Sequence, residues 1–359
     1  MARGQAFLTA ADDGLKSLSP SSFAMVMATA ALSLAAHVQG LTALAQTLGR
    51  LNIVFYLIFW TLVVWRMVRH PREVRNDLTD HLKSPGFFTM VAGTCTLGSQ
   101  LLIQNQMVAV AWWLWGLGAL LWVVFTYAVF SALTLKTVKP TLAHGISGSW
   151  LLAVVATQAL AVLSALLAPE LSEPLREGLE FSSLCLWLVG GVMYVWMISL
   201  IVYRYTFQPL TPGDLFPSYW INMGAMAIST LAGATLLLMG EGSVPLIRDL
   251  RPFITGVTIL FWATGTWWIP MLVVLGVWRH GIRRFPFKYD MNFWGVVFPL
   301  AMYTLGTWQL ITALELEFLR SIPSVGLYVA LAAWLIVLVG MAGAVLRSLT
   351  GAASASADT

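Results

Sequence analysis

Long apolar segments recur along this chain from Phe23 to Val345, and only short polar stretches separate them. A helix needs about 20 residues to cross the roughly 30 Å hydrocarbon core of a bilayer, and most of these segments have that length. Only 10% of the 359 residues are charged, against about 25% in soluble domains. That is too little charge to cover a water-facing surface, so the sequence predicts an all-α polytopic membrane protein.

Segment length and flanking charge divide the chain into ten predicted transmembrane helices. A segment of residues 1–19 precedes them without the apolar stretch of a cleavable signal peptide, and an Ala/Ser-rich tail of residues 348–359 is predicted to be disordered. The membrane domain is expected to occupy residues 20–347. The predicted spans are 20–38, 51–67, 86–103, 107–134, 147–168, 181–203, 217–239, 253–278, 291–313 and 323–346.

Positive charges are distributed unevenly between the two sides of the predicted domain. Of the 20 Lys and Arg residues, 15 fall on the side of the termini, and the other 5 are Arg50, Arg176, Arg248, Arg251 and Arg320. Basic residues favour the cytoplasmic side, so we expect a multi-pass protein of the inner (plasma) membrane with both termini cytoplasmic. The net charge of +4 lies in loops beside apolar spans, which argues against nucleic-acid binding.

Residue types that carry catalytic or metal chemistry are scarce in the spans. Their interiors contain no Asp, Glu or Lys, the groups that carriers driven by protons or sodium often place at mid-membrane. Cys95 and Cys185 lie in apolar segments without a CxxC motif or a Cys/His cluster, and the histidines are isolated. We therefore expect no enzymatic activity, no cofactor and no metal site.

The odd-numbered spans begin alike, which indicates an internal repeat. Each carries an aromatic residue near its start, often preceded by Ser or Pro, and we expect these rings at the membrane interface. Each interval between them holds one helical hairpin, so five hairpins predict a quasi-five-fold bundle whose odd helices surround a central pore. Chance is the alternative, because aromatics make up 12% of the chain. The five residues, 62 to 74 positions apart, are Phe23, Phe88, Trp150, Trp220 and Trp294.

One level of this pore is predicted four residues past each aromatic, at Met27, Ala92, Val154, Gly224 and Phe298. Phe298 is the one large aromatic at this level and is the candidate gate, although ordinary packing is the alternative.

Helix breaks are also predicted at this depth. Pro299 lies about 12 Å into its span at 1.5 Å per residue and is predicted to kink it. Gly93 and Gly224 are predicted to kink two other spans. Broken helices would aim positive ends at the axis and favour an anion there.

Two segments resemble a known family. Pro20-Ser-Ser-Phe-Ala-Met-Val-Met-Ala-Thr-Ala and Phe293-Trp-Gly-Val-Val-Phe298-Pro299 resemble the tellurite-resistance/dicarboxylate transporter family, which includes plant slow-type anion channels, yeast malate transporters and sulfite exporters. The resemblance runs from about Leu18 to Arg347. It implies a homotrimer with one pore in each protomer and a gate formed by a phenylalanine of the ninth helix, here Phe298.

The leading interpretation is therefore a gated anion channel or channel-like uniporter that moves small anions across the lipid bilayer. The alternative is a secondary carrier that exports C4-dicarboxylate such as malate, sulfite or a tellurite-type oxyanion. The charge-free spans favour the channel, and the breadth of the family supports the carrier. A membrane sensor or scaffold is a third class, which the lack of a sizeable soluble domain disfavours.

Overall fold

The computed structural model describes residues 11–240 and 243–355, with side chains described to Arg347. Ten helices in this part of the chain are long and apolar enough to cross a membrane, which confirms the predicted all-α class. They form five hairpins, each with an inner and an outer helix. The inner helices are α2 (Ala24–Val38), α5 (Phe88–Asn105), α8 (Leu152–Leu167), α10 (Ile221–Leu238) and α13 (Trp294–Leu314). The outer helices are α3 (Thr42–Arg69), α6 (Val108–Leu135), α9 (Leu175–Phe207), α12 (Arg251–Gly276) and α14 (Ser321–Ala355).

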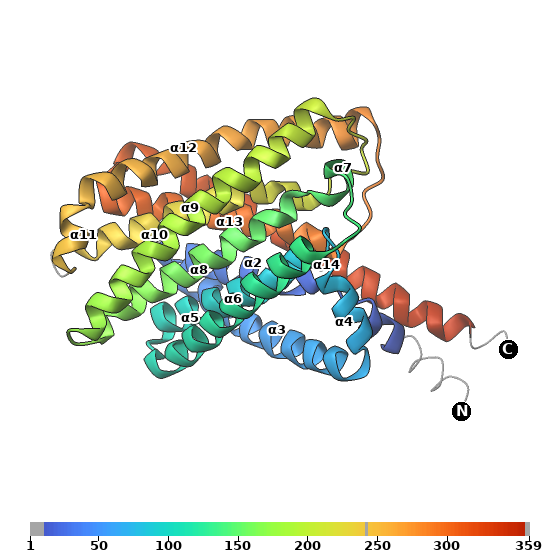
Figure 1. The fold of residues 1–359 in the computed structure, drawn as a ribbon, viewed down its shortest axis with the longest axis horizontal. Coiled ribbons are helices and arrows are strands. Elements are labelled where there is room, and N and C mark those ends of the chain that lie inside the picture. Colours follow the sequence, from blue (N-terminus) through green and yellow to red (C-terminus); the bar gives the residue numbers. More distant parts are fainter. Residues whose placement is uncertain (1–10, 241–242, 356–359) are drawn as a thin grey trace.

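The inner helices form a closed ring of five. Each packs against the next along the chain, and α13 packs against α2 to complete the ring. Each outer helix packs against the inner helix of its own hairpin. The helices run along the long axis of the bundle, and the first and last described residues lie at the same end (Figure 1).

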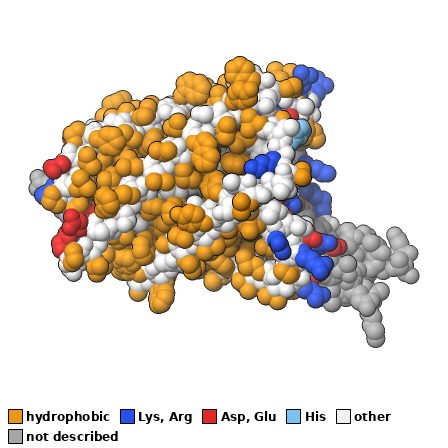
Figure 2. Space-filling view, viewed as in Figure 1, with side chains coloured by type: hydrophobic (Ala, Val, Ile, Leu, Met, Phe, Trp, Pro, Cys, Tyr) orange, Lys and Arg blue, Asp and Glu red, His pale blue; other side chains and the backbone are white. Residues whose placement is uncertain are grey.

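Burial separates the two rings. The most apolar stretch of α5 is 94% buried, and that of α6 is 17% buried. Outer helices expose large apolar side chains such as Trp113, which is 81% exposed, and such side chains cover the face of the bundle in Figure 2. A surface of this kind is stable in lipid and not in water, because lipid chains replace the missing packing partners.

Charged side chains gather at the two ends of the bundle. Lys and Arg concentrate at the end that holds the two described chain ends, and acidic side chains mark the opposite end (Figure 2). The end of the bundle at which Lys and Arg concentrate is called the basic end below.

Each inner helix begins at the basic end with a short 3-10 turn. The turns are η1 (Pro20–Phe23), η2 (Ser84–Phe87), η3 (Gly148–Leu151), η5 (Pro217–Trp220) and η8 (Met291–Phe293). Three have side-chain caps: the Ser19 hydroxyl accepts from the Ser21 N–H at 3.2 Å, Ser147 caps η3 in the same way, and Asp290 caps η8. Proline lies in the first turn of η1, η2 and η5, where its missing N–H leaves no bond unmade. Five positive helix ends therefore surround the axis at this end.

A repeated basic contact closes four of the hairpins. A side chain at the basic end of an outer helix donates to a backbone carbonyl just before the inner helix of the same hairpin. The pairs are Arg66 with Lys16, Lys136 with Thr79, Arg204 with Ala143, and Arg279 with Leu215. These contacts fix the connectors from which the inner helices start.

Several boundaries differ from the prediction. Helix α3 begins at Thr42 rather than residue 51, because Ala45, Leu48 and Gly49 are buried in the bundle while polar neighbours face outward. Helix α9 extends beyond both predicted ends. Helix α14 continues to Ala355, into the tail predicted to be disordered, since alanine has the highest helix propensity. Residues 356–359 of that tail and 1–10 of the N-terminal segment lie outside the described residues.

Candidate functional site along the bundle axis

Three cavities follow one another inside the ring of inner helices. A vestibule of about 520 Å³ opens at the basic end. An inner chamber of about 10 Å³ comes next, and an outer chamber of about 50 Å³ lies farther along the same helices. All five inner helices or their 3-10 turns contribute side chains to each chamber.

The lining residues recur with the same spacing on every inner helix. On η8 and α13 they are Asn292, Gly295 and Phe298 for the inner chamber, then Met302, Leu305 and Gln309 for the outer chamber. On η5 and α10 the corresponding positions 218, 221, 228, 231 and 235 line the chambers, and on η3 and α8 positions 149, 152, 159, 162 and 166 do so. Steps of three and four residues keep one face of a helix toward one line. The chambers therefore lie on a single axis, and the five-fold repeat extends over its whole length.

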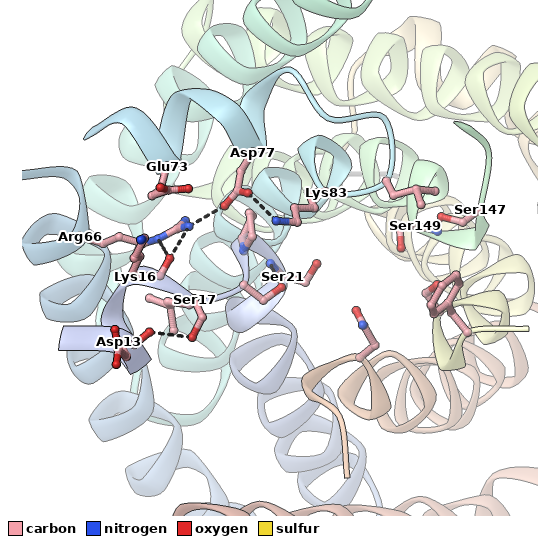
Figure 3. Close-up of a pocket in the computed structure, with 17 residues that line it drawn as sticks. Asp13, Lys16, Ser17, Ser21, Arg66, Glu73, Asp77, Lys83, Ser147 and Ser149 are labelled. Atoms are coloured by element: carbon pink, nitrogen blue, oxygen red, sulfur yellow. Dashed lines mark hydrogen bonds and ion pairs between the residues drawn. The ribbon is translucent and has the colours of Figure 1, made fainter. Parts of the chain in front are cut away.

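Four small polar side chains separate the vestibule from the inner chamber and line both cavities. They are Ser21, Ser149, Ser218 and Asn292, and we call them the polar ring. Figure 3 shows Ser21 and Ser149 beside the vestibule, on elements far apart in the sequence. Each belongs to the 3-10 turn of an inner helix, so hydroxyl and amide groups lie where the positive helix ends converge.

An ion-pair cluster around the buried Arg66 and Asp77 forms one wall of the vestibule (Figure 3). Arg66 lies 2.6 Å from one carboxylate oxygen of Asp77, and Lys83 lies 2.9 Å from the other. Arg66 also donates to the Lys16 carbonyl at 3.1 Å. The vestibule contains three basic and three acidic side chains: Lys16, Arg66 and Lys83, and Asp13, Glu73 and Asp77. Because these formal charges balance, the helix ends supply the net positive potential.

A side cavity of about 230 Å³ adjoins the vestibule and shares Ser147, Phe216 and Ser218 with it. Asp214 lines this cavity in a connector outside the spans. Burial raises the pKa of Asp214, but hydrogen bonds from Thr211 and the nearby Arg204 guanidinium outweigh burial and hold the pKa below its ordinary value. Asp214 is thus an anion that holds Arg204, whose guanidinium lies 3.4 Å away.

Phe298 lies between the two chambers. Its side chain is 1% exposed and lines the inner chamber together with Met27. Met302, one turn farther along α13, lines the outer chamber. A cavity needs about 10–15 Å³ to hold one water, so the inner chamber of about 10 Å³ has no room for a hydrated ion. The axis is therefore too narrow for a hydrated ion at the inner chamber, whose wall includes Phe298.

The outer chamber is apolar over most of its wall. Three of its polar residues, Thr96, Ser99 and Thr235, donate their hydroxyl hydrogens to backbone carbonyls of their own helices at 2.8, 3.1 and 2.8 Å. Among the described residues, none that lines either chamber is charged. The walls beyond Phe298 therefore offer an anion few polar contacts.

The predicted pore level matches the spacing of the lining residues on every inner helix except α8. Met27 lines the inner chamber directly, and the spacing of lining residues on α5 places Ala92 at the same level. The spacing on α8 gives Val155 rather than Val154. Trp150 is not the repeat residue of this helix, because its indole N–H donates to the His81 and Gly145 carbonyls. The buried Leu151 takes that position in the repeat.

The two glycines act in helix packing. A Cβ on Gly93 would lie 3.3 Å from the Phe23 ring, and one on Gly224 would lie 2.6 Å from Cγ of Pro299. Gly93 therefore faces Phe23 and not the axis, and Gly224 lets α10 approach α13 at the level of Phe298. Phe23 is fully buried, with its ring centroid 5.6 Å from that of Trp60, so this ring packs inside the bundle and does not face lipid.

Helix α13 continues through Pro299 as one helix, so the predicted break with a positive end near mid-membrane is wrong. Proline lacks an N–H and thereby leaves the carbonyl four residues earlier, that of Gly295, without its helical donor. The proline thus leaves the Gly295 carbonyl, and not an N–H, without a helical partner at this depth. The positive ends lie instead at the polar ring, which the sequence reasoning missed although the Ser-Pro starts were its signal.

Comparison with known proteins agrees with this architecture. The family described as voltage-dependent anion channel matches residues 17–342. An uncharacterized membrane protein of Mycobacterium tuberculosis is 41% identical over 149 residues, 42% of this chain and 75% of that protein. An uncharacterized transporter of Methanocaldococcus jannaschii is 23% identical over 82% of this chain and 84% of its own. A sulfite efflux pump of Trichophyton rubrum is 24% identical over 76% of this chain and 74% of its own.

Proposed function

Because the chain belongs to the voltage-dependent anion channel family, we propose that it moves small anions along the bundle axis as a gated channel or channel-like uniporter. One observation carries the proposal: Phe298 is the large side chain between two chambers that all five inner helices line. Rotation of this ring off the axis would join the chambers, whereas the helices could stay in place.

The proposed path has three stages. An anion collects in the vestibule, where the ends of five helices favour negative charge. The hydroxyl and amide groups of the polar ring then replace part of its hydration shell, as pore-lining dipoles do in other channels. Phe298 blocks the next step, because an apolar constriction without water is a high barrier to an ion.

A coupled carrier is the second candidate. Its support is the likeness to a sulfite efflux pump, which suggests an oxyanion such as sulfite as substrate, and the resemblance noted above adds malate and tellurite-type oxyanions. A carrier coupled to protons or sodium commonly uses an acidic side chain at mid-membrane. The chamber walls in the described part of the chain hold no such group, so we favour the channel.

We extend the proposal to placement and assembly. The basic end would face the cytoplasm with both termini, in the inner membrane of the cell. Three copies would associate through their lipid-facing surfaces, each with its own pore, as the family resemblance implies.

The test is anion current in a planar bilayer. Phe298→Ala should raise the current at least tenfold, and the current should persist when a bulky cation replaces sodium. Removing a buried phenylalanine ordinarily costs about 3–5 kcal/mol of stability, but a ring beside a chamber has fewer partners to lose, so protein yield should stay near normal.

The matched control is Phe88→Ala. Phe88 is also 1% exposed, begins an inner helix and does not line a chamber. Its loss should lower the yield and leave the current unchanged. Equal currents in the two variants would reject Phe298 as the gate. A current that disappears without sodium would favour the coupled carrier.

A further inference from the structure

Three arginines in the described part of the chain have almost no exposed surface, and they differ in their partners. Arg66 is paired with Asp77 at 2.6 Å, and Arg204 with Asp214 at 3.4 Å. Arg279 is 7% exposed, yet no carboxylate of the described residues lies within 4.0 Å of it. A buried charge without a counter-ion is strongly destabilising, so this site calls for an anion.

The contacts of Arg279 leave part of its guanidinium unused. One terminal nitrogen donates to the Leu215 carbonyl, and the guanidinium carbon lies 4.5 Å from the centre of the Phe285 ring. The Nε–H is buried and has no hydrogen-bond partner. The acidic residue in the next connector, Asp290, instead accepts from the Asn292 N–H at 2.7 Å. Arg279 therefore retains an unused N–H donor and has no carboxylate in direct contact, while Asp290 acts on its charge from a longer distance.

Arg279 lines a groove of about 500 Å³ between η5, α12, α13 and α14. The wall is mostly apolar and includes Trp220, Val296, Ala333, Ile336, Val337 and Gly340. His280 and Arg347 also line it. Arg279 and His280 lie in the π-helical turn Val277–Ile282 that follows α12, and Arg347 lies near the end of α14, so these basic residues gather at the basic end of the bundle. From Ala333 to Gly340 the wall extends about 10 Å along α14, at 1.5 Å per residue.

We propose that this groove binds one anionic phospholipid from the leaflet at the basic end. Its phosphate would lie on Arg279, and one acyl chain would follow the apolar wall along α13 and α14. A small soluble anion would leave the apolar wall without a contact. A neutral lipid would bring no net negative charge to Arg279. Basic pockets between membrane helices recognise anionic headgroups in this way.

The lipid would contact the helix that carries Phe298, because Val296 lines the groove two residues earlier on α13. Any effect of the lipid on current rests on the proposed function. Binding itself does not, so it is measured separately and without current.

The experiment measures lipid binding to the purified, delipidated protein by native mass spectrometry, with phosphatidylglycerol and phosphatidylcholine as probes. The wild type should retain one phosphatidylglycerol per chain in preference to phosphatidylcholine. Arg279→Gln should weaken phosphatidylglycerol binding at least tenfold. Arg283→Gln is the matched control and should change it less than twofold, since Arg283 is exposed and does not line the groove.

A second variant guards against misfolding of Arg279→Gln. Ala333→Leu fills the apolar wall and keeps every charge, so it should also weaken phosphatidylglycerol binding several-fold. Inorganic phosphate at millimolar concentration should not displace the lipid. Three outcomes would overturn the proposal: equal binding of the two lipids, equal loss in the Arg279 and Arg283 variants, or displacement by inorganic phosphate with Ala333→Leu unaffected, which would assign the site to a soluble anion.

Discussion

The two parts of the axial path on either side of Phe298 differ in size, in chemistry and in the elements that line them. Before Phe298, the vestibule has a volume of about 520 Å³ and is lined by charged and hydroxyl groups. Beyond it, the outer chamber has about 50 Å³ and a mostly apolar wall. Connectors and 3-10 turns supply most of the vestibule lining, whereas side chains of the five inner α-helices line the outer chamber.

This difference indicates where an anion would lose and recover favourable contacts. The vestibule has room for water and is bordered by helix ends and the polar ring, so an anion would find favourable contacts there. The outer chamber offers a low-dielectric wall in which charges interact more strongly than in water. A charge introduced by mutation should therefore matter more beyond Phe298 than before it.

The largest expected effect is a loss of stability when the ion pair in the vestibule wall is removed. Asp77→Ala would leave the buried Arg66 without a counter-ion, and removing one partner of a buried pair costs about 3–5 kcal/mol. The apparent melting temperature of the detergent-solubilised protein should fall markedly. Asp80→Ala is the control: Asp80 is more exposed, and its side chain accepts from the Leu82 and Lys83 N–H groups of a turn. A smaller loss for Asp77→Ala than for Asp80→Ala would contradict the role of the ion-pair cluster.

The next effect concerns the outer chamber. In a Phe298→Ala background, Leu231→Asp should reduce anion current at least tenfold, a change of about 1.4 kcal/mol, because the carboxylate would face the narrow axis. Leu231→Asn has the same shape without the charge and should reduce the current much less. Currents are normalised to the amount of protein in the bilayer. Equal reductions by Asp and Asn would mean that polarity or misfolding, and not charge, is responsible.

Much of this architecture could be predicted from the sequence. Apolar length gave ten helices, and the repeated helix starts gave the ring, because both depend on local residue order. The one-residue error at Val154 arose where local order was insufficient, since the indole of Trp150 bonds to two loop carbonyls and so does not mark the repeat.

Tertiary contacts were harder to predict. The roles of Gly93 and Gly224 depend on Phe23 and Pro299 in neighbouring helices, and no spacing within one helix reveals such a contact. Likewise, the pairing of Arg66 with Asp77 and the unpaired state of Arg279 became visible only when the connectors were placed against the helix ends.

The smallest expected effect is a change in current when the polar ring is altered. It tests the vestibule side of the comparison between the two parts of the path. Ser149→Ala removes one hydroxyl, while Ser21, Ser218 and Asn292 remain, and water in the wide vestibule can replace the lost contact. We expect a current change of less than twofold in the Phe298→Ala background.

In the same background, Ser149→Asp should lower the current only a few-fold, because water and salt screen a charge there. Reversal potentials in asymmetric salt report selectivity alongside current. If Ser149→Asp reduced the current as strongly as Leu231→Asp does, the vestibule would be no more screened than the outer chamber, and the contrast between the two parts of the path would fail.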